Sequence, residues 1–204
     1  MNDAVLTFAV EPHVRFLRTW PWYLTRASGI IAAISLVLLM VTGITMFIGY
    51  EFKFMQPLKA WANHRTLGIV FSISVAVHVL SLLFDKYISF TIPQVLVPFA
   101  SDYKPVHLLG LAVGSLGVAL GVLSLYLVIA IVYTSLTKNM TQRPRFWKWT
   151  HYLSYAVILL IFFHSIMIGT DLKSGLWRWS WIVANTIILV LVGLRLRRVG
   201  SLRG

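Results

Sequence analysis

The sequence predicts an all-α fold: a polytopic membrane helix bundle with about five transmembrane helices. Of the 204 residues, 58% are hydrophobic and only 12% are charged, and the mean hydropathy is +0.81. Soluble globular domains do not have such a composition. Uncharged apolar stretches long enough to cross a bilayer alternate with short polar or basic loops, which is typical of membrane-spanning helices.

The composition also excludes several classes of protein. Cysteine is absent, which excludes disulfides, iron–sulfur clusters and thiolate-ligated haem. The net charge is +12, but the basic residues lie in short loops beside apolar spans, as membrane topology requires. We therefore expect membrane lipid, and no nucleic acid, as the partner of this charge. Eight Trp and eight Tyr fit an aromatic belt at the membrane interfaces.

No hydrophilic block is long enough to fold separately, so one bundle is expected. The chain divides into an N-terminal interfacial segment, a helical membrane domain and a basic tail, residues 1–26, 27–196 and 197–204. The five spans are expected at residues 27–50, 63–84, 107–136, 146–171 and 179–194. Residues 86–106 contain three prolines and are too interrupted for a span, so they predict a surface segment or a short amphipathic helix over one mouth of the bundle.

Small residues mark two of the spans. In the first span they are Ser28, Gly29, Thr42 and Gly43. In the third span they are Gly110, Gly114, Gly117 and Gly121. Such residues permit close packing on a neighbouring helix or on a flat macrocycle. For the first span, a lipid-facing helix with ordinary small residues is an equally good interpretation.

Four histidines stand inside otherwise apolar spans: His64 and His78 in the second, His151 and His164 in the fourth. The spacings are 78 − 64 = 14 and 164 − 151 = 13 residues. At about 1.5 Å per residue, each pair lies roughly 20 Å apart along its helix, one histidine near each face of a hydrocarbon core about 30 Å thick. Intramembrane histidines are costly and indicate function. Two such helices side by side suit bis-histidine ligation of two b-type haems at two depths.

The two spacings differ in their helical geometry. Fourteen residues bring His78 to about 40° from His64, so these two share a helix face, with Phe71 midway between them. Phe71 is predicted either to pack between two cofactors or to belong to the core. Thirteen residues leave His164 about 140° out of phase with His151 on a regular helix. Either this helix is overwound or bent, or His151 reaches in from its first turn, and the basic loop just before His151 favours the second.

Basic residues predict the orientation of the bundle. Eleven lie on the side of the 51–65 loop, the 138–148 loop and the C-terminal tail, and seven lie on the other side. The positive-inside rule therefore predicts an outside N-terminus and a cytoplasmic C-terminus. The second and fourth spans then run parallel, which pairs His64 with His151 on the cytoplasmic side and His78 with His164 on the outer side.

Polar residues near the interfaces are candidates to hold the haem propionates. On the inner side they are Arg65, Arg145, Lys148 and Tyr152. On the outer side they are Lys86, Tyr87, Tyr103 and Lys104. His107, at a span edge, is a candidate to touch the haem or support a ligand, and His13 is a further candidate, although an ordinary surface histidine is the simpler interpretation.

Two other interpretations of the histidines remain open. They can be structural, with hydrogen bonds between helices, or they can line a metal or proton pathway. Transport pathways usually recruit Asp or Glu inside the membrane. All six acidic residues lie outside the spans or at their ends: Asp3, Glu11, Glu51, Asp85, Asp102 and Asp171. This distribution favours a redox function.

Several motifs resemble the ferric reductase-like transmembrane domain. They are HR-x-LGI from His64, PFASDYKP from Pro98, TS at 134–135, and W-x-x-x-HYLSY from Trp147. The resemblance covers roughly residues 26–194. This family includes the membrane parts of eukaryotic NADPH oxidases and metalloreductases, and the haem-binding subunit of the bacterial periplasmic methionine sulfoxide reductase system. It implies one haem b on His64 and His151 and a second on His78 and His164.

The resemblance implies a function that the chain performs with partners. The sequence contains no G-x-G-x-x-G loop and no flavin domain, so a flavin would act through a partner protein. The expected function is a dihaem cytochrome b that passes single electrons across the bacterial inner membrane. The donor would be a separate flavoprotein or quinol, and the external acceptor ferric iron, dioxygen or a protein. The alternatives are a membrane subunit that docks and reduces a periplasmic redox enzyme, and a non-redox histidine-lined transporter.

Overall fold

The computed structural model describes residues 12–50, 56–103, 107–108, 111–137 and 142–201. Within these ranges, five helices are long and apolar enough to cross a membrane, at Thr19–Phe47, Pro57–Leu82, Gly114–Leu136, Pro144–Ile168 and Gly175–Arg197. The predicted all-α, multi-pass membrane bundle is thus confirmed.

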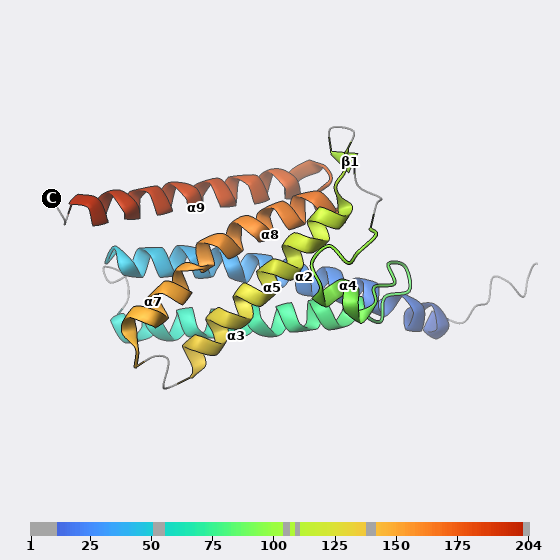
Figure 1. Cartoon of the computed structure of the whole chain (residues 1–204), viewed down its shortest axis with the longest axis horizontal. Coiled ribbons are helices and arrows are strands. Elements are labelled where there is room, and N and C mark those ends of the chain that lie inside the picture. The colour runs from blue at the N-terminus through green and yellow to red at the C-terminus, as the bar shows by residue number, and fades with distance from the viewer. Residues whose placement is uncertain (1–11, 51–55, 104–106, 109–110, 138–141, 202–204) are drawn as a thin grey trace, which may run out of the picture.

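The first four spans form two antiparallel helix pairs. Helix α2 (Pro12–Phe47) packs along α3 (Pro57–Leu82), and α5 (Gly114–Leu136) packs along α8 (Ser154–Ile168). The last helix, α9 (Gly175–Ser201), lies mainly against α2 (Figure 1). The two pairs meet along a seam. There α3 lies against α5, and α2 lies against α8.

The ends of the bundle are distinct in Figure 1. One end holds the start of α3 and the end of α9, and the other holds the start of α2. We call the first the inner end and the second the outer end, after the predicted orientation. A proline begins both elements that enter from the inner end, α3 at Pro57 and α7 (Pro144–Tyr152) at Pro144. Proline suits a first helical turn because its fixed φ is helical and the N–H that it lacks would have no intrahelical partner.

The third span begins later than predicted. Residues from His107 do not continue as helix: β1 (His107–Leu108) pairs with β2 (Leu111–Ala112), and α5 begins only at Gly114. At that point the backbone of Tyr103 crosses the helix start, because a Cβ on Gly114 would overlap the Tyr103 carbonyl oxygen. The crossing chain and the β1–β2 pairing therefore decide where this helix starts.

The fourth span is interrupted. Helix α7 ends at Tyr152, and α8 begins at Ser154. At the break, the Leu153 N–H bonds the Thr150 carbonyl at 3.1 Å, three residues back, so the chain is locally overwound. His151 therefore lies in the last turn of α7. The prediction that His151 reaches in from a first turn is wrong, and the alternative of an overwound or bent helix holds.

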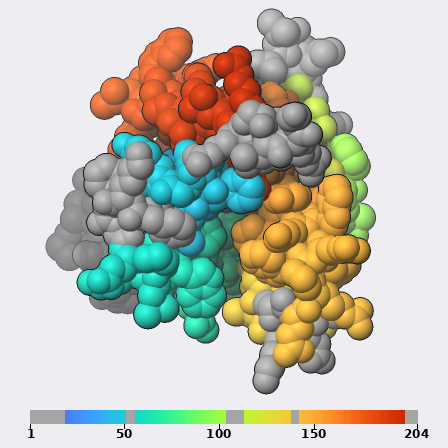
Figure 2. All heavy atoms as spheres, turned by 90° about the vertical axis from the view of Figure 1, so that its left-hand side faces the viewer, coloured from blue at the N-terminus to red at the C-terminus, as the bar shows by residue number. Residues whose placement is uncertain are grey.

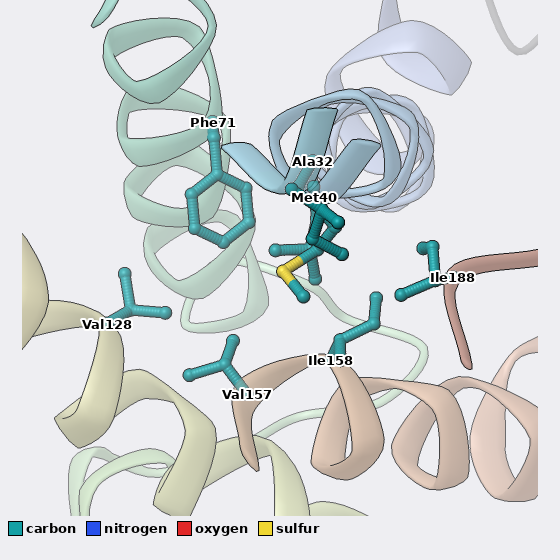
Figure 3. Close-up of a cluster of buried hydrophobic side chains, with 9 residues drawn as sticks. Ala32, Met40, Phe71, Val128, Val157, Ile158 and Ile188 are labelled. Carbon is teal, nitrogen blue, oxygen red and sulfur yellow. The ribbon is translucent and has the colours of Figure 1, made fainter. Parts of the chain in front are cut away.

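Apolar side chains fill the middle of the bundle. Met40, Phe71, Val128 and Val157 are buried, and each comes from a different helix of the two pairs (Figure 3). Phe71 lies seven residues from both histidines of its helix, and Val157 lies six residues after His151 and seven before His164. This apolar layer thus separates two histidine levels. Outward-facing side chains such as Ile34 and Ile73 stay exposed, as a lipid-facing surface requires.

The segment after α3 forms a surface element at the outer end, as predicted. Asp85 is buried, and its carboxylate accepts the N–H groups of Tyr87 and Ile88. Helix α4 (Ile92–Leu96) follows, and the Tyr126 hydroxyl of α5 donates to the Leu96 carbonyl at 2.6 Å. The Tyr126 bond attaches the segment to the middle of α5.

Candidate functional site

Two glycines of α2 face the two histidines of α3. A Cβ on Gly29 would lie 3.1 Å from His78 Nδ1, and one on Gly43 would lie 3.2 Å from His64 Cε1. The glycine spacing, 43 − 29 = 14, equals the histidine spacing, so the antiparallel pair is in register at both levels. Each imidazole ring rests on a bare stretch of the α2 backbone. The small residues of the first span thus serve helix contact and do not face lipid.

The other helix pair repeats this design at the outer level. A Cβ on Gly121 would lie 2.5 Å from His164 Nδ1, so only glycine fits there without movement of the ring. Gly117, one turn earlier, gives room to Ile168 and Met167 of α8. Helices α5 and α8 therefore approach closely where His164 lies, and its ring is enclosed between them.

Hydrogen bonds orient the two outer histidines. His78 Nδ1 lies 2.8 Å from the Thr25 carbonyl oxygen, and His164 Nδ1 lies 2.8 Å from the Gly117 carbonyl oxygen. A carbonyl only accepts, so Nδ1 carries the proton in both rings. In a neutral imidazole, Nε2 then has the free lone pair, which is the state that a metal ligand needs.

His64 reaches the same state through a side chain. Its Nδ1 lies 3.1 Å from Thr42 Oγ1, and that hydroxyl donates its own hydrogen to the Leu38 carbonyl at 2.8 Å. The hydroxyl has no second hydrogen, so it accepts from His64 Nδ1–H. His64 Nε2 is therefore also left with its lone pair.

His151 is held differently. Its ring stacks on Trp147, one turn earlier in α7, with centroids 5.0 Å apart and planes at 24°. Its Nδ1 is buried without a hydrogen-bond partner among the described residues, and the same holds for Trp147 Nε1. Stacking, and not a hydrogen bond, sets the orientation of this ring.

The histidines meet across the seam in two pairs. The rings of His64 and His151 lie 6.1 Å apart, centroid to centroid, with an angle of 55° between their planes. His78 and His164 interact electrostatically at the other level. The break at Leu153 contributes to this arrangement, because its overwinding adds rotation between His151 and His164. Figure 2, which views the inner end, shows a cleft between the first turns of α3 and α7.

The inner-side candidates for propionate contacts are mostly exposed. The Arg65 guanidinium lies 5.8 Å from the Trp61 ring centroid, and Arg145 and Lys148 are also exposed. Tyr152 is 38% exposed and stacks against Tyr155 across the helix break. Phe71 belongs to the apolar layer between the two histidine levels.

The outer-side candidates differ in burial. Lys86 and Tyr87 are exposed, whereas Tyr103 is half-buried, with its ring 5.9 Å from that of Phe90. Burial raises the pKa of the Tyr103 phenol above its ordinary value. Lys104 lies outside the described residues.

Two further histidines cannot be placed relative to the site. His13 lies in the first turn of α2 and His107 in β1, and their side chains are outside the described part of the chain.

Three contacts were not predicted from the sequence. They are the bond from Arg195 to Tyr155, the bond between Thr42 and His64, and the stacking of Trp147 on His151. Arg195 belongs to the basic run at the end of the last span, yet its guanidinium donates to the Tyr155 hydroxyl, 40 residues away in the chain. No local pattern reveals such a contact. Trp147 did have a signal, because its i, i+4 spacing to His151 places both rings on one helix face.

Comparison with known proteins gives one match. The family model for the ferric reductase like transmembrane component matches residues 52–162, more than half of the chain. The matched region contains His64, His78 and His151 and ends two residues before His164. No curated protein and no solved structure matches. Domains of this family generally bind haem and are membrane electron-transfer components that typically work with redox partners. The chain therefore belongs to the family of ferric reductase like transmembrane components.

Proposed function

We propose that this chain is a dihaem cytochrome b that passes single electrons across the membrane. The observation that carries the proposal is the inner pair, His64 and His151, whose rings come from opposite helix pairs and face each other across the seam. His78 and His164, enclosed in their helix pairs at the outer level, repeat the ligand set. Three of the four rings have Nδ1 bonded to an acceptor, which leaves Nε2 free to ligate a metal.

The spacing of the inner pair suits two axial ligands on one iron. A metal–nitrogen distance of about 2 Å on each side, plus the radius of each imidazole ring, puts the centroids roughly 6 Å apart. The observed separation is 6.1 Å. The described residues contain no group of three or more His, Cys, Asp or Glu side chains that converge. Each level thus offers two protein ligands, which is the number that a haem iron takes beyond its macrocycle.

The packing of the bundle also suits a flat cofactor. Helices pack tightly within each pair, where glycines receive the histidine rings, but contacts between the two pairs, α3 with α5 and α2 with α8, are sparse along the seam. The cleft at the inner end opens along this seam (Figure 2). His64 and His151 would hold the inner haem from its two faces, and His78 and His164 the outer one.

Bound haem supplies an iron couple, ferric to ferrous, that takes up and returns one electron. The chain's residues determine what this couple can do. Two histidines at each level would hold the iron and leave it no position for a substrate, which favours electron transfer. The apolar layer of Phe71, Val128 and Val157 excludes water and ions between the levels. Two levels roughly 20 Å apart divide the bilayer into steps that an electron can cross.

The remaining assignments concern location and partners. We place the protein in a bacterial inner membrane with the His64–His151 pair on the cytoplasmic side, which rests on the excess of basic residues at that end. Electrons would enter from a separate flavoprotein or from quinol, and leave at the outer end to ferric iron, dioxygen or a protein. A flavin would belong to the partner.

Visible spectroscopy of the detergent-purified protein tests the proposal, with haem quantified per chain as the pyridine haemochrome. The expected result is sharp α and β bands after dithionite reduction and about two b-type haems per chain. One haem would overturn the dihaem relay and favour a subunit that docks and reduces a periplasmic redox enzyme. No haem, even after expression with added haem precursor, would overturn the redox function and leave the transporter and structural interpretations.

A further inference from the structure

Arg195 lies in an aromatic cage at the inner end of the bundle. Its guanidinium carbon is 3.9 Å from the Phe47 ring centroid, 5.0 Å from that of Tyr152 and 5.4 Å from that of Tyr155. It also donates a hydrogen bond to the Tyr155 hydroxyl. An arginine in the basic run at the end of the last span would be expected to extend into water, but Arg195 instead connects α9 to the ends of α2, α7 and α8.

The cage places a positive charge beside one histidine level. Tyr152 and Tyr155 flank the break at Leu153, and Tyr152 directly follows His151 in the chain. Arg195 interacts electrostatically with both Tyr152 and His151. Arginine keeps its charge at all physiological pH values, so this is a fixed cation next to the inner pair.

The outer level has no equivalent cation among the described residues that face it. Arg26 follows Thr25, whose carbonyl binds His78, but it forms a bidentate ion pair with Asp171. Among the described residues, all three carboxylates, Asp85, Asp102 and Asp171, belong to segments at the outer end. Within the described part of the chain, the cation at the inner level, Arg195, therefore has no carboxylate beside it. The cation at the outer level, Arg26, is neutralised by Asp171.

We propose that Arg195 tunes the inner redox centre: its fixed charge raises the reduction potential of the haem held by His64 and His151. The inference rests on the proposed function. An electron that arrives at the inner level adds a negative charge, and a nearby cation in a medium of low dielectric constant stabilises it. The charge thus favours uptake of an electron by the inner haem, which suits the point where an electron from a cytoplasmic donor enters the membrane. Arg195 is a tuning residue and ligates nothing.

The test is a potentiometric titration of the purified protein in Arg195→Gln, Arg195→Lys and Arg197→Gln variants. Arg197 is exposed, has the same charge and lies two residues further along α9, so it is the matched control. Arg195→Gln is expected to lower the equilibrium constant for reduction of the inner haem about tenfold or more, which corresponds to a midpoint about 59 mV lower. Arg195→Lys keeps most of the effect, and Arg197→Gln leaves both midpoints unchanged.

Haem content separates the two hypotheses. If the unmodified protein binds no haem, the proposed function fails before Arg195 is tested. If both haems bind but Arg195→Gln and Arg197→Gln give the same inner midpoint, the tuning role of Arg195 is overturned and the dihaem assignment stands.

A second pair of variants covers the case in which Arg195→Gln does not fold. Phe47→Glu places a carboxylate next to the guanidinium and is expected to lower the inner midpoint. Phe47→Gln introduces an uncharged side chain of the same size as glutamate and is not expected to lower that midpoint. Equal midpoints in these two variants would also overturn the proposal.

Discussion

Different chemical groups orient the histidine rings at the two levels. At the outer level, backbone carbonyls of Thr25 and Gly117 orient the rings of His78 and His164. At the inner level, a hydroxyl orients His64 and an indole ring stacks on His151. A carbonyl in a helix is present whatever the side chain, but a threonine or a tryptophan can be replaced. The outer level is therefore set by how the helices pack, and the inner level by individual side chains.

The levels differ also in their local structure. The inner level lies beside a break in the fourth span and beside Arg195, whereas at the outer level His164 lies within the regular helix α8. Rings held between closely packed helices have little freedom to move. We therefore expect substitutions around the outer level to act on haem retention, and substitutions around the inner level to act mainly on the reduction potential.

The largest expected effect is the loss of one whole centre. His78→Ala and His164→Ala should each remove the outer haem, because each takes away one of two axial ligands, and the content should fall from about two haems per chain to about one. The pyridine haemochrome gives the content, and electron paramagnetic resonance identifies the haem that remains. Ser165→Ala is the matched control, since its hydroxyl bonds only the Phe162 carbonyl. If the two histidine variants retained different haems, the pairing would be wrong.

Glycine substitutions should have the next largest effect, a weaker retention of haem that differs between positions. A Cβ at position 121 would lie 2.5 Å from His164 Nδ1, so Gly121→Ala should displace the ring and break its bond to Gly117. Overpacking costs about 1–3 kcal/mol, so the outer haem should be retained roughly 5–150-fold less tightly. Gly43→Ala, where the nearest His64 atom lies 3.2 Å away, should have a smaller effect on the inner haem.

Gly68→Ala is the control for this series, because the methyl group that alanine would add to α3 at this position has no neighbouring atom of a described residue within 4 Å. Titration of haem into the haem-depleted variants measures how tightly each variant binds haem. Equal retention in Gly121→Ala and Gly68→Ala would show that the close approach of α5 to His164 has no role in holding the haem.

Thr42→Val should shift a potential without removing a haem. The substitution keeps the shape of the side chain and removes the oxygen that accepts from His64 Nδ1–H. Without that bond, the imidazole is a weaker electron donor to the iron, so the inner midpoint should rise, opposite in sign to Arg195→Gln. A redox titration resolves both midpoints, and the outer one should stay constant. Thr66→Val, whose hydroxyl bonds only the Ala62 carbonyl, is the control on the neighbouring helix.

The smallest effect is expected at the outer ion pair. Both side chains of the Arg26–Asp171 pair are about one-third exposed, at 33% and 31%, so Asp171→Asn should change the free energy of unfolding by about 1 kcal/mol or less. It would, however, leave Arg26 without its carboxylate and so raise the outer midpoint slightly. A thermal denaturation curve and a redox titration measure the two effects. A fall in the outer midpoint would contradict the electrostatic comparison between the levels.

The sequence by itself determined the class of the fold and the content of the candidate site. Length and hydropathy define the spans, because each segment that crosses a bilayer must itself contain enough consecutive apolar residues. The spacings of 14 and 13 residues set two histidine depths, since the helical rise is constant. The shared depth of His64 and His151 follows from these spacings once the two spans run parallel.

Tertiary structure alone decided the remaining features. The start of α5 at Gly114 depends on the Tyr103 backbone that crosses it, and the register of Gly29 and Gly43 with two histidines appears only when α2 meets α3. The Arg195 cage joins residues from α2, α7, α8 and α9. Contacts between side chains far apart in the sequence depend on helix rotation and packing, and no single span contains that information.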